Sequence, residues 1–169
     1  MQFTFCPDCG GRLIKKSIGD EGEIPFCESC GRPWFSFSYP CVICLLTDGA
    51  GNYALIRQTY ATKNYVCVAG FIKEQETAEQ TAAREICEET GLEVLNMRYV
   101  GSYYYPKHDN LMLGYLCTVK RDEFRLSGEV ERAGWFGLEE TRELLSHGTV
   151  GKELLRDSLK QGTQKGWLI

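Results

Sequence analysis

The 169-residue sequence lacks any apolar run that approaches the roughly 20 residues of a membrane-spanning helix. It also lacks an excess of positive charge, since 19 Lys and Arg face 23 Asp and Glu. A net charge of -4 argues against a protein built to bind nucleic-acid phosphates. No secretory signal pattern, internal repeat or low-complexity tract is present. We therefore expect a soluble, cytoplasmic protein without a membrane partner.

Cysteine is abundant by contrast, and its arrangement is the first chemical signal. Cys6 and Cys9 form one C-x-x-C pair, Cys27 and Cys30 form a second, and a glycine follows each pair. Two such pairs can present four thiolates to one tetrahedral Zn²⁺, and a glycine after each pair permits the tight turn. The spacing is that of a zinc ribbon, so we predict that these four cysteines hold a structural zinc ion.

Disulfide bonds are the alternative for these cysteines. The total of nine is odd, however, and Cys67, Cys87 and Cys117 lie in apolar or helical patterns typical of core residues. Cys41 and Cys44 repeat the C-x-x-C spacing, but inside an apolar, strand-like run with no following glycine. We therefore predict reduced cysteines, with the Cys41 and Cys44 pair in the core.

The length suits one medium-sized domain and a small module. About 38 residues bury too little surface to fold without a metal or another cross-link, so zinc would supply the stability of the module. We predict a zinc ribbon at residues 1–38 and a second domain at residues 39–169. Whether the ribbon also contacts a partner stays open.

The second chemical signal is a helix that carries clustered acids. Residues 78–90 contain good helix formers and no Pro or Gly, and Gly91 stands where a helix ends. Glu85, Glu88 and Glu89 lie at i, i+3 and i+4, so their carboxylates share one face. A hard divalent cation, Mg²⁺ or Mn²⁺, would relieve their repulsion. The alternative is a solvated acidic face.

The segment from residue 70 to 92 resembles the signature of the Nudix hydrolase family. The matching positions are Gly70, Glu76, Arg84, Glu85, Ile86, Glu88, Glu89, Gly91 and Leu92. The resemblance implies an α+β protein, an α/β/α sandwich with a mixed sheet, that uses divalent metals to direct water at the phosphorus of a diphosphate. One departure is Gln75, where many members have glycine.

The resemblance also implies roles for individual residues. Three carboxylates would be metal ligands or the base, with the identity of the base left open: Glu85, Glu88 and Glu89. Glu76 would pair with Arg84 to brace the loop against the helix, and the Gly70 carbonyl would reach the metal. Cationic contacts to substrate would come from elsewhere, with Arg57, Lys63 and Lys107 as candidates.

A zinc ribbon directly before this signature is similar to the NADH pyrophosphatase branch of the family. That likeness implies a further metal ligand at Glu129, with Glu131 as its nearest rival, and base stacking on Phe71. The branch typically has a Ser-Gln-Pro-Trp-Pro-Phe-Pro stretch after the box, which residues 101–110 lack. Tyr103 and Tyr105 are candidates for stacking there, although strand alternation leaves at least one neighbouring tyrosine facing the core.

The rest of the chain reads as strands around the acidic helix, closed by a second helix. The strands are expected at residues 41–47, 53–58, 65–71, 94–105, 111–121 and 134–138, and the closing helix at 149–161. This order is compatible with the α/β/α sandwich that the resemblance implies.

The expected function is metal-dependent hydrolysis of a small nucleotide-linked diphosphate with release of AMP, with NAD(H) or ADP-ribose ahead of FAD and of nucleoside triphosphates. One alternative is a non-catalytic nucleotide sensor, in which the ribbon contacts a partner or nucleic acid; such sensors usually lose box carboxylates that this chain retains. Another is decapping of NAD-capped RNA, for which a basic groove would discriminate. A homodimer is implied only by the resemblance.

Overall fold

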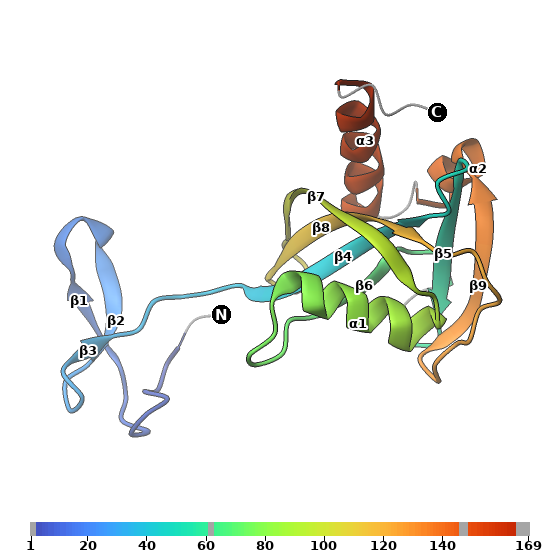
Figure 1. Cartoon of the computed structure of the whole chain (residues 1–169). Coiled ribbons are helices and arrows are strands. Elements are labelled where there is room, and N and C mark those ends of the chain that lie inside the picture. Colours follow the sequence, from blue (N-terminus) through green and yellow to red (C-terminus); the bar gives the residue numbers. More distant parts are fainter. Residues whose placement is uncertain (1–2, 61–62, 146–148, 165–169) are drawn as a thin grey trace. The chain divides into compact units, whose positions relative to one another are not determined.

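The computed structural model describes residues 3–60, 63–145 and 149–164. The chain divides into two compact units, Met1–Tyr39 and Pro40–Ile169 (Figure 1). Within the described ranges, no helix is long and apolar enough to cross a bilayer.

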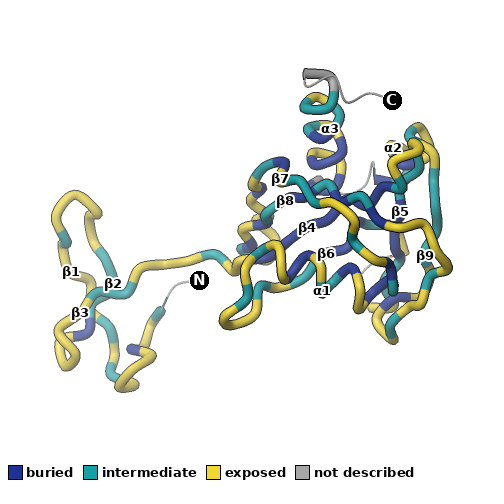
Figure 2. The backbone as a smooth tube through the Cα atoms, viewed as in Figure 1, coloured by how far each residue is buried: buried dark blue, intermediate teal, exposed yellow. Residues whose placement is uncertain are grey.

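The first unit is a small antiparallel sheet with little apolar core. Its elements are β1 (Ile14–Ser17), the 3-10 helix η1 (Gly19–Glu21), β2 (Glu23–Cys27) and β3 (Arg32–Pro33), with the strands in the order β1-β2-β3. Only Cys6 and Cys27 are buried among the described residues of this unit, and most of its chain is exposed (Figure 2). Trp34 packs against Phe3, with ring centroids 5.5 Å apart. So small a core cannot stabilise the unit alone.

The second unit is built around a six-stranded sheet. Its strands run in the order β7-β8-β4-β5-β9, and β6 also pairs with β4. They are β4 (Tyr39–Thr47), β5 (Asn52–Gln58), β6 (Val68–Phe71), β7 (Val94–Tyr105), β8 (Asn110–Val119) and β9 (Val130–Gly137). The helices are α1 (Ala78–Thr90), α2 (Leu138–Leu144) and α3 (Thr149–Gln164).

Helices cover both faces of this sheet, because successive residues of a strand point to opposite sides. Val42 of β4 packs in one core with Ile86 of α1, whereas the next residue, Ile43, packs in a second core with Leu154 of α3. Figure 1 shows α1 and α3 on opposite sides of the sheet. The result is an α/β/α sandwich with an apolar layer on each face.

Local sequence fixes the ends of α1. The Thr77 hydroxyl accepts a hydrogen bond from the backbone N–H of Gln80, and the side-chain oxygen of Gln80 accepts one from the backbone N–H of Thr77. These two bonds form a capping box. Gly91 ends the helix with a φ of 71°, in the left-handed region that glycine favours. Gln75 also has a positive φ, 64°, in the loop before the helix. This conformation explains why glycine suits that position in similar sequences.

Candidate active site

A pocket of about 550 Å³ opens beside the second half of the acidic helix, at Arg84, Glu85, Glu88 and Glu89. It is lined by residues of β4, β6, α1 and β8 and of the loop before β9. Seven residues predicted from the sequence line it: Gly70, Phe71, Arg84, Glu85, Glu88, Glu89 and Glu129. The fold therefore brings residues from three separate segments to one cavity.

Glu89 is the most unusual carboxylate of the pocket. Its side chain is 5% exposed, and its Oε2 atom has no hydrogen-bond partner. Burial, together with the charges of Glu85, Glu129 and Glu88, raises the pKa of Glu89 to about 8. A buried carboxylate oxygen without a partner is costly to keep, so a ligand for this Oε2 atom is expected.

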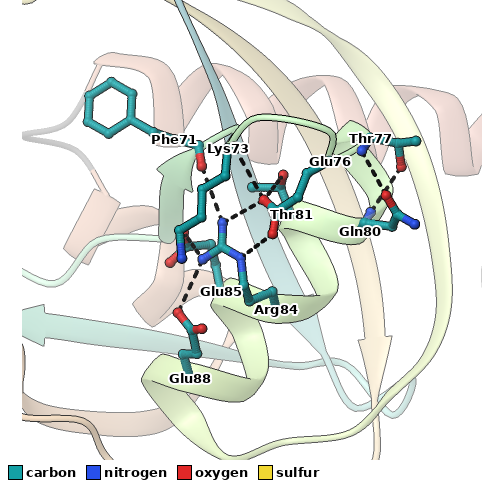
Figure 3. Close-up of polar contacts among 9 residues, drawn as sticks. All are labelled: Phe71, Lys73, Glu76, Thr77, Gln80, Thr81, Arg84, Glu85 and Glu88. Atoms are coloured by element: carbon teal, nitrogen blue, oxygen red, sulfur yellow. Dashed lines mark hydrogen bonds and ion pairs between the residues drawn. The ribbon is translucent and has the colours of Figure 1, made fainter.

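Arg84 binds three carboxylates at once (Figure 3). Its Nε and Nη2 atoms donate to the two oxygens of Glu76 at 2.7 and 2.8 Å, a bidentate pair that lowers the pKa of Glu76 to about 2. Its Nη1 atom donates to Glu85 at 2.6 Å and to Glu88 at 3.1 Å. Arg84 thus ties the loop before α1 to the acids of the helix.

The same loop is anchored by two further contacts. The Glu76 carboxylate accepts a hydrogen bond from the Thr81 hydroxyl at 2.8 Å, and Arg84 donates to the carbonyl of Phe71 at 3.3 Å. In Figure 3 this carbonyl faces the guanidinium while the Phe71 ring projects away from the carboxylates. The ring is 56% exposed and lines the pocket. An aromatic ring in a pocket can stack on a planar group of a ligand.

Gly70 is required by close approach. A Cβ atom at this position would lie 2.1 Å from the carboxyl carbon of Glu85. The absence of a side chain therefore lets the Glu85 carboxylate lie against the β6 backbone.

We expect Gly70→Ala to lower kcat/KM by roughly 10- to 100-fold, because a shift of about 1 Å in a catalytic group can cost that much. The melting temperature should change little, since the obstructing atoms belong to a side chain that can move. Gly137→Ala is the matched control, because a Cβ at Gly137 would meet nothing within 4 Å. Equal losses in the two variants would contradict this role for Gly70.

The two rival acids near β9 have different surroundings. Glu129 lines the pocket, and its Oε2 atom accepts a hydrogen bond from the Tyr60 hydroxyl at 3.3 Å. Glu131 instead forms an ion pair with Arg57 at 2.7 Å. The structure therefore places Glu129, and not Glu131, beside the acids of α1.

The structure places three other predicted residues outside the pocket lining. Tyr103 is buried in the core beneath α3, and its hydroxyl donates to Asp157 at 3.3 Å. Tyr105 packs against the same core, and its ring lies 5.6 Å from that of His108. Arg57 is held by Glu131. Strand alternation turns Tyr103 and Tyr105 to the face opposite Tyr104, which is 58% exposed.

Sequence reasoning did not identify eight residues that line the pocket: Cys41, Tyr60, Ala69, Lys73, Asn110, Met112, Ser127 and Gly128. Tyr60 and Lys73 lie in loops whose sequence shows no pattern. Asn110 and Met112 begin β8, two residues apart on one face. The strand predicted at residues 111–121 includes Met112, but nothing in the sequence marks its face as part of a pocket.

The carboxylates fit a hard divalent cation. Glu85, Glu88, Glu89 and Glu129 present oxygen atoms around one cavity, and one of those oxygens is buried without a partner. Oxygen ligands of this kind suit Mg²⁺ or Mn²⁺. The donor set is therefore compatible with the predicted metals.

The four cysteines of the first unit fit zinc. Their Sγ atoms all lie within 4.8 Å of one another, with Cys9 and Cys27 at 3.5 Å and Cys6 and Cys30 at 3.9 Å. Tetrahedral zinc with bonds of about 2.3 Å separates its sulfur ligands by about 3.8 Å. The glycine after each pair has a positive φ, 72° and 68°, as the turn demands.

The raised pKa of Glu89 predicts a pH-dependent stability in buffer without Mg²⁺ or Mn²⁺. The pKa is about 8 in the folded protein and near 4.5 in the unfolded chain, so the contribution is fully present below pH 4.5 and lost as the pH rises through 8. Glutamine does not titrate. Glu89→Gln should therefore melt above the native protein at pH 8.5, by on the order of 5 °C, or about 2 kcal/mol.

Calorimetry across this pH range measures the effect. The exposed Glu140→Gln substitution is the control, and its difference from the native protein should not vary with pH. A constant difference for Glu89→Gln as well would show that the Glu89 carboxylate is not perturbed.

An α/β/α sandwich with an acidic helix beside a pocket defines the class of protein, and comparison identifies the family. A model described as the NUDIX domain matches residues 38–157, more than half of the chain. The chain therefore belongs to the NUDIX family. The predicted α+β class and the resemblance stated from residues 70–92 are confirmed.

The chain is also similar to curated proteins named "NAD-capped RNA hydrolase NudC". It is 30% identical to that of Vibrio cholerae over 158 residues, which cover 93% of this chain and 58% of the relative. It is 31% identical to that of Vibrio atlanticus over 164 residues, again 93% and 58%. The chain thus spans less than two thirds of the length of these relatives.

Solved structures share the fold. A NUDIX hydrolase from Nitrosomonas europaea superposes with a TM-score of 0.77 at 22% identity, over 96% of this chain and 93% of that one. The NUDIX domain of Shewanella oneidensis NrtR, crystallised with ADP ribose, gives a TM-score of 0.61 at 16% identity. The match covers 79% of this chain and 94% of that one. At these identities the likeness speaks for the fold alone.

Proposed function

We propose that the chain hydrolyses the diphosphate of a nucleoside-diphosphate-linked compound, with NAD(H) or ADP-ribose as the small-molecule substrate. Water forms a new bond to one phosphorus, and the bond from that phosphorus to the bridging oxygen breaks. The bridging oxygen leaves with the other phosphate, and two monophosphates, one of them AMP, are released. The proton of the water passes to a glutamate of the pocket.

The observation that carries this proposal is the buried Glu89 carboxylate, with an unpartnered oxygen, among three further acids in one pocket. Arg84 pairs with Glu85 and Glu88. The buried Oε2 atom of Glu89, by contrast, has no partner, so the charge of Glu89 still lacks compensation. A divalent cation supplies that compensation, and when bound it neutralises phosphate charge and acidifies water. The alternative of a solvated acidic face does not account for a glutamate that is 5% exposed.

Individual residues then have distinct tasks. Glu85, Glu88, Glu89 and Glu129 would hold Mg²⁺ or Mn²⁺ together with the Gly70 carbonyl, and Phe71 would stack on a ring of the substrate. Arg84 positions Glu85 and Glu88 and is itself fixed by Glu76. The proton of the attacking water goes to one of Glu85, Glu88 and Glu89, and the identity of this base stays open.

A second candidate substrate is RNA that carries NAD at its 5′ end. The names of the curated relatives favour it, and the bond to be broken is the same. The pocket lining offers two cations, Lys73 and Arg84, and Arg84 is engaged by carboxylates. Contacts to RNA beyond the cap would therefore have to come from residues outside the pocket.

The experiment is a chromatographic product assay with Mg²⁺ or Mn²⁺. The substrates are NADH, NAD⁺, ADP-ribose, FAD, nucleoside triphosphates and a short NAD-capped RNA, each with native protein and with Glu89→Gln. Metal-dependent release of a monophosphate by the native protein alone would support hydrolysis, and the ratio of kcat/KM for NAD-capped RNA to NAD⁺ would choose between the substrates. Binding of a compound without any product would favour a non-catalytic sensor instead.

A further inference from the structure

Four buried side-chain nitrogen or oxygen atoms have no hydrogen-bond partner in the described part of the chain. They are Trp34 Nε1, Arg57 Nε, Glu89 Oε2 and Asn110 Oδ1. Two of these atoms, those of Glu89 and Asn110, belong to residues that line the same pocket. A metal would satisfy Glu89, but the proposed chemistry assigns nothing to Asn110.

Asn110 is buried at the wall of the pocket. It is the first residue of β8, opposite Tyr105 of β7, and it is 8% exposed. Met112, two residues further on, is 9% exposed and also lines the pocket, whereas Leu111 between them is 42% exposed. Strand alternation therefore turns Asn110 and Met112 to the same side.

The surroundings of Asn110 differ from those of the metal carboxylates. β8 lies beside β4, whose Cys41 lines the pocket and pairs in register with Phe71 of β6. The acids come instead from α1 and from the loop before β9. The pocket thus has an acidic part and a part with a thiol, a thioether, an aromatic ring and one amide, which suits a planar organic group more than a phosphate.

We propose that the Asn110 carboxamide oxygen accepts a hydrogen bond from the amino or carboxamide N–H of the ring that stacks on Phe71. This inference rests on the proposed function and names what the pocket recognises in its substrate. The buried oxygen can only accept, and it gains a partner only when the ring carries a donor. Adenine and nicotinamide both present an NH₂ group in the ring plane, so the experiment has to decide which one Asn110 contacts.

Three dinucleotides distinguish a hydrogen bond donated by the adenine NH₂ group from one donated by the nicotinamide NH₂ group. NAD⁺ carries both donors, 3-acetylpyridine adenine dinucleotide lacks the one on the pyridine, and nicotinamide hypoxanthine dinucleotide lacks the one on the purine. Each is hydrolysed by native protein and by Asn110→Leu, which keeps the volume and removes the acceptor. Asn96→Leu, the same change at an exposed position of β7, is the control.

We expect Asn110→Leu to lower kcat/KM for NAD⁺ by about 10-fold, mainly through KM, because a contact made equally in the bound and transition states does not alter kcat. The loss should disappear with the one analogue that lacks the donor. An equal loss with all three dinucleotides, or no loss with any of them, would overturn the proposal.

Thermal melting separates recognition from a structural role. Removing an unpartnered buried oxygen should leave the melting temperature unchanged or raise it. A marked drop for Asn110→Leu would mean that Asn110 supports the β7–β8 turn, and the proposal would fail.

Failure of the proposed function can be distinguished from failure of the inference about Asn110. If native protein hydrolyses none of the dinucleotides, the proposed function fails, and calorimetric binding of AMP and of nicotinamide mononucleotide decides the role of Asn110. A selective loss of binding of one mononucleotide in Asn110→Leu would support it. Unchanged binding of both would reject it.

Discussion

Glu89→Gln is expected to lower metal-dependent turnover by roughly 10²–10⁴-fold, the range that removal of a general base costs. Glutamine keeps the size of the side chain but can neither take up the proton nor offer a charged ligand to the metal. Folding should be retained, because the substitution removes a carboxylate that desolvation and three neighbouring acids already disfavour. Loss of activity should therefore coincide with unchanged or higher stability.

The measurement is kcat/KM for NAD⁺ or ADP-ribose with saturating Mg²⁺, next to a melting curve for each protein. Glu140→Gln, which removes a carboxylate at an exposed position of α2, is the matched control and should behave as the native protein does. Turnover by Glu89→Gln within a factor of two or three of native would disprove the assignment of this residue.

Loss of zinc is expected to unfold the first unit and to leave the second folded. Only Cys6 and Cys27 are buried among the described residues of that unit, so its stability has to come from the metal. Zinc binding by structural cysteine sites is worth about 10–16 kcal/mol at neutral pH, far more than so small a core can supply. Cys9→Ser removes one of the four ligands.

Zinc content and backbone amide NMR spectra measure this effect. Cys9→Ser should lose zinc and the dispersed amide signals of Met1–Tyr39, while the signals of Pro40–Ile169 persist. Cys87→Ser changes an exposed cysteine outside the cluster, so it should retain both. A dispersed spectrum for the first unit after verified loss of zinc would rule out the stabilising role.

Elements with strong local signals could be predicted from the sequence. The helix at Ala78–Thr90 has the predicted bounds, because no Pro or Gly interrupts these residues and Gly91 follows them as the end of the helix. The strand at Val94–Tyr105 also agrees. By contrast, α2 at Leu138–Leu144 was not anticipated, since its seven residues carry too little periodicity. The ribbon strands were missed because their residues are mostly exposed and show no alternation.

The candidate site divides in the same way. Residues 70–92 are contiguous and carry fixed spacing, so the carboxylates of α1 and their neighbours follow from the sequence. Glu129 could be placed only by resemblance, because it lies 40 residues after Glu89 in the chain. Tyr103 was expected to contact substrate, but its side chain packs beneath α3 in this structure. Which face of β7 is buried depends on α3, which lies far away in sequence.

The sequence alone thus determined the family, the acidic helix and the four thiols of the ribbon, because each depends on residues at short, fixed spacing. Tertiary structure decided which side-chain oxygen atoms are buried away from solvent. The raised pKa of Glu89 and the unpartnered amide of Asn110 arise where α1, β8 and the loop before β9 enclose one cavity. Desolvation depends on what surrounds an atom in space, and short-range sequence patterns carry no record of it.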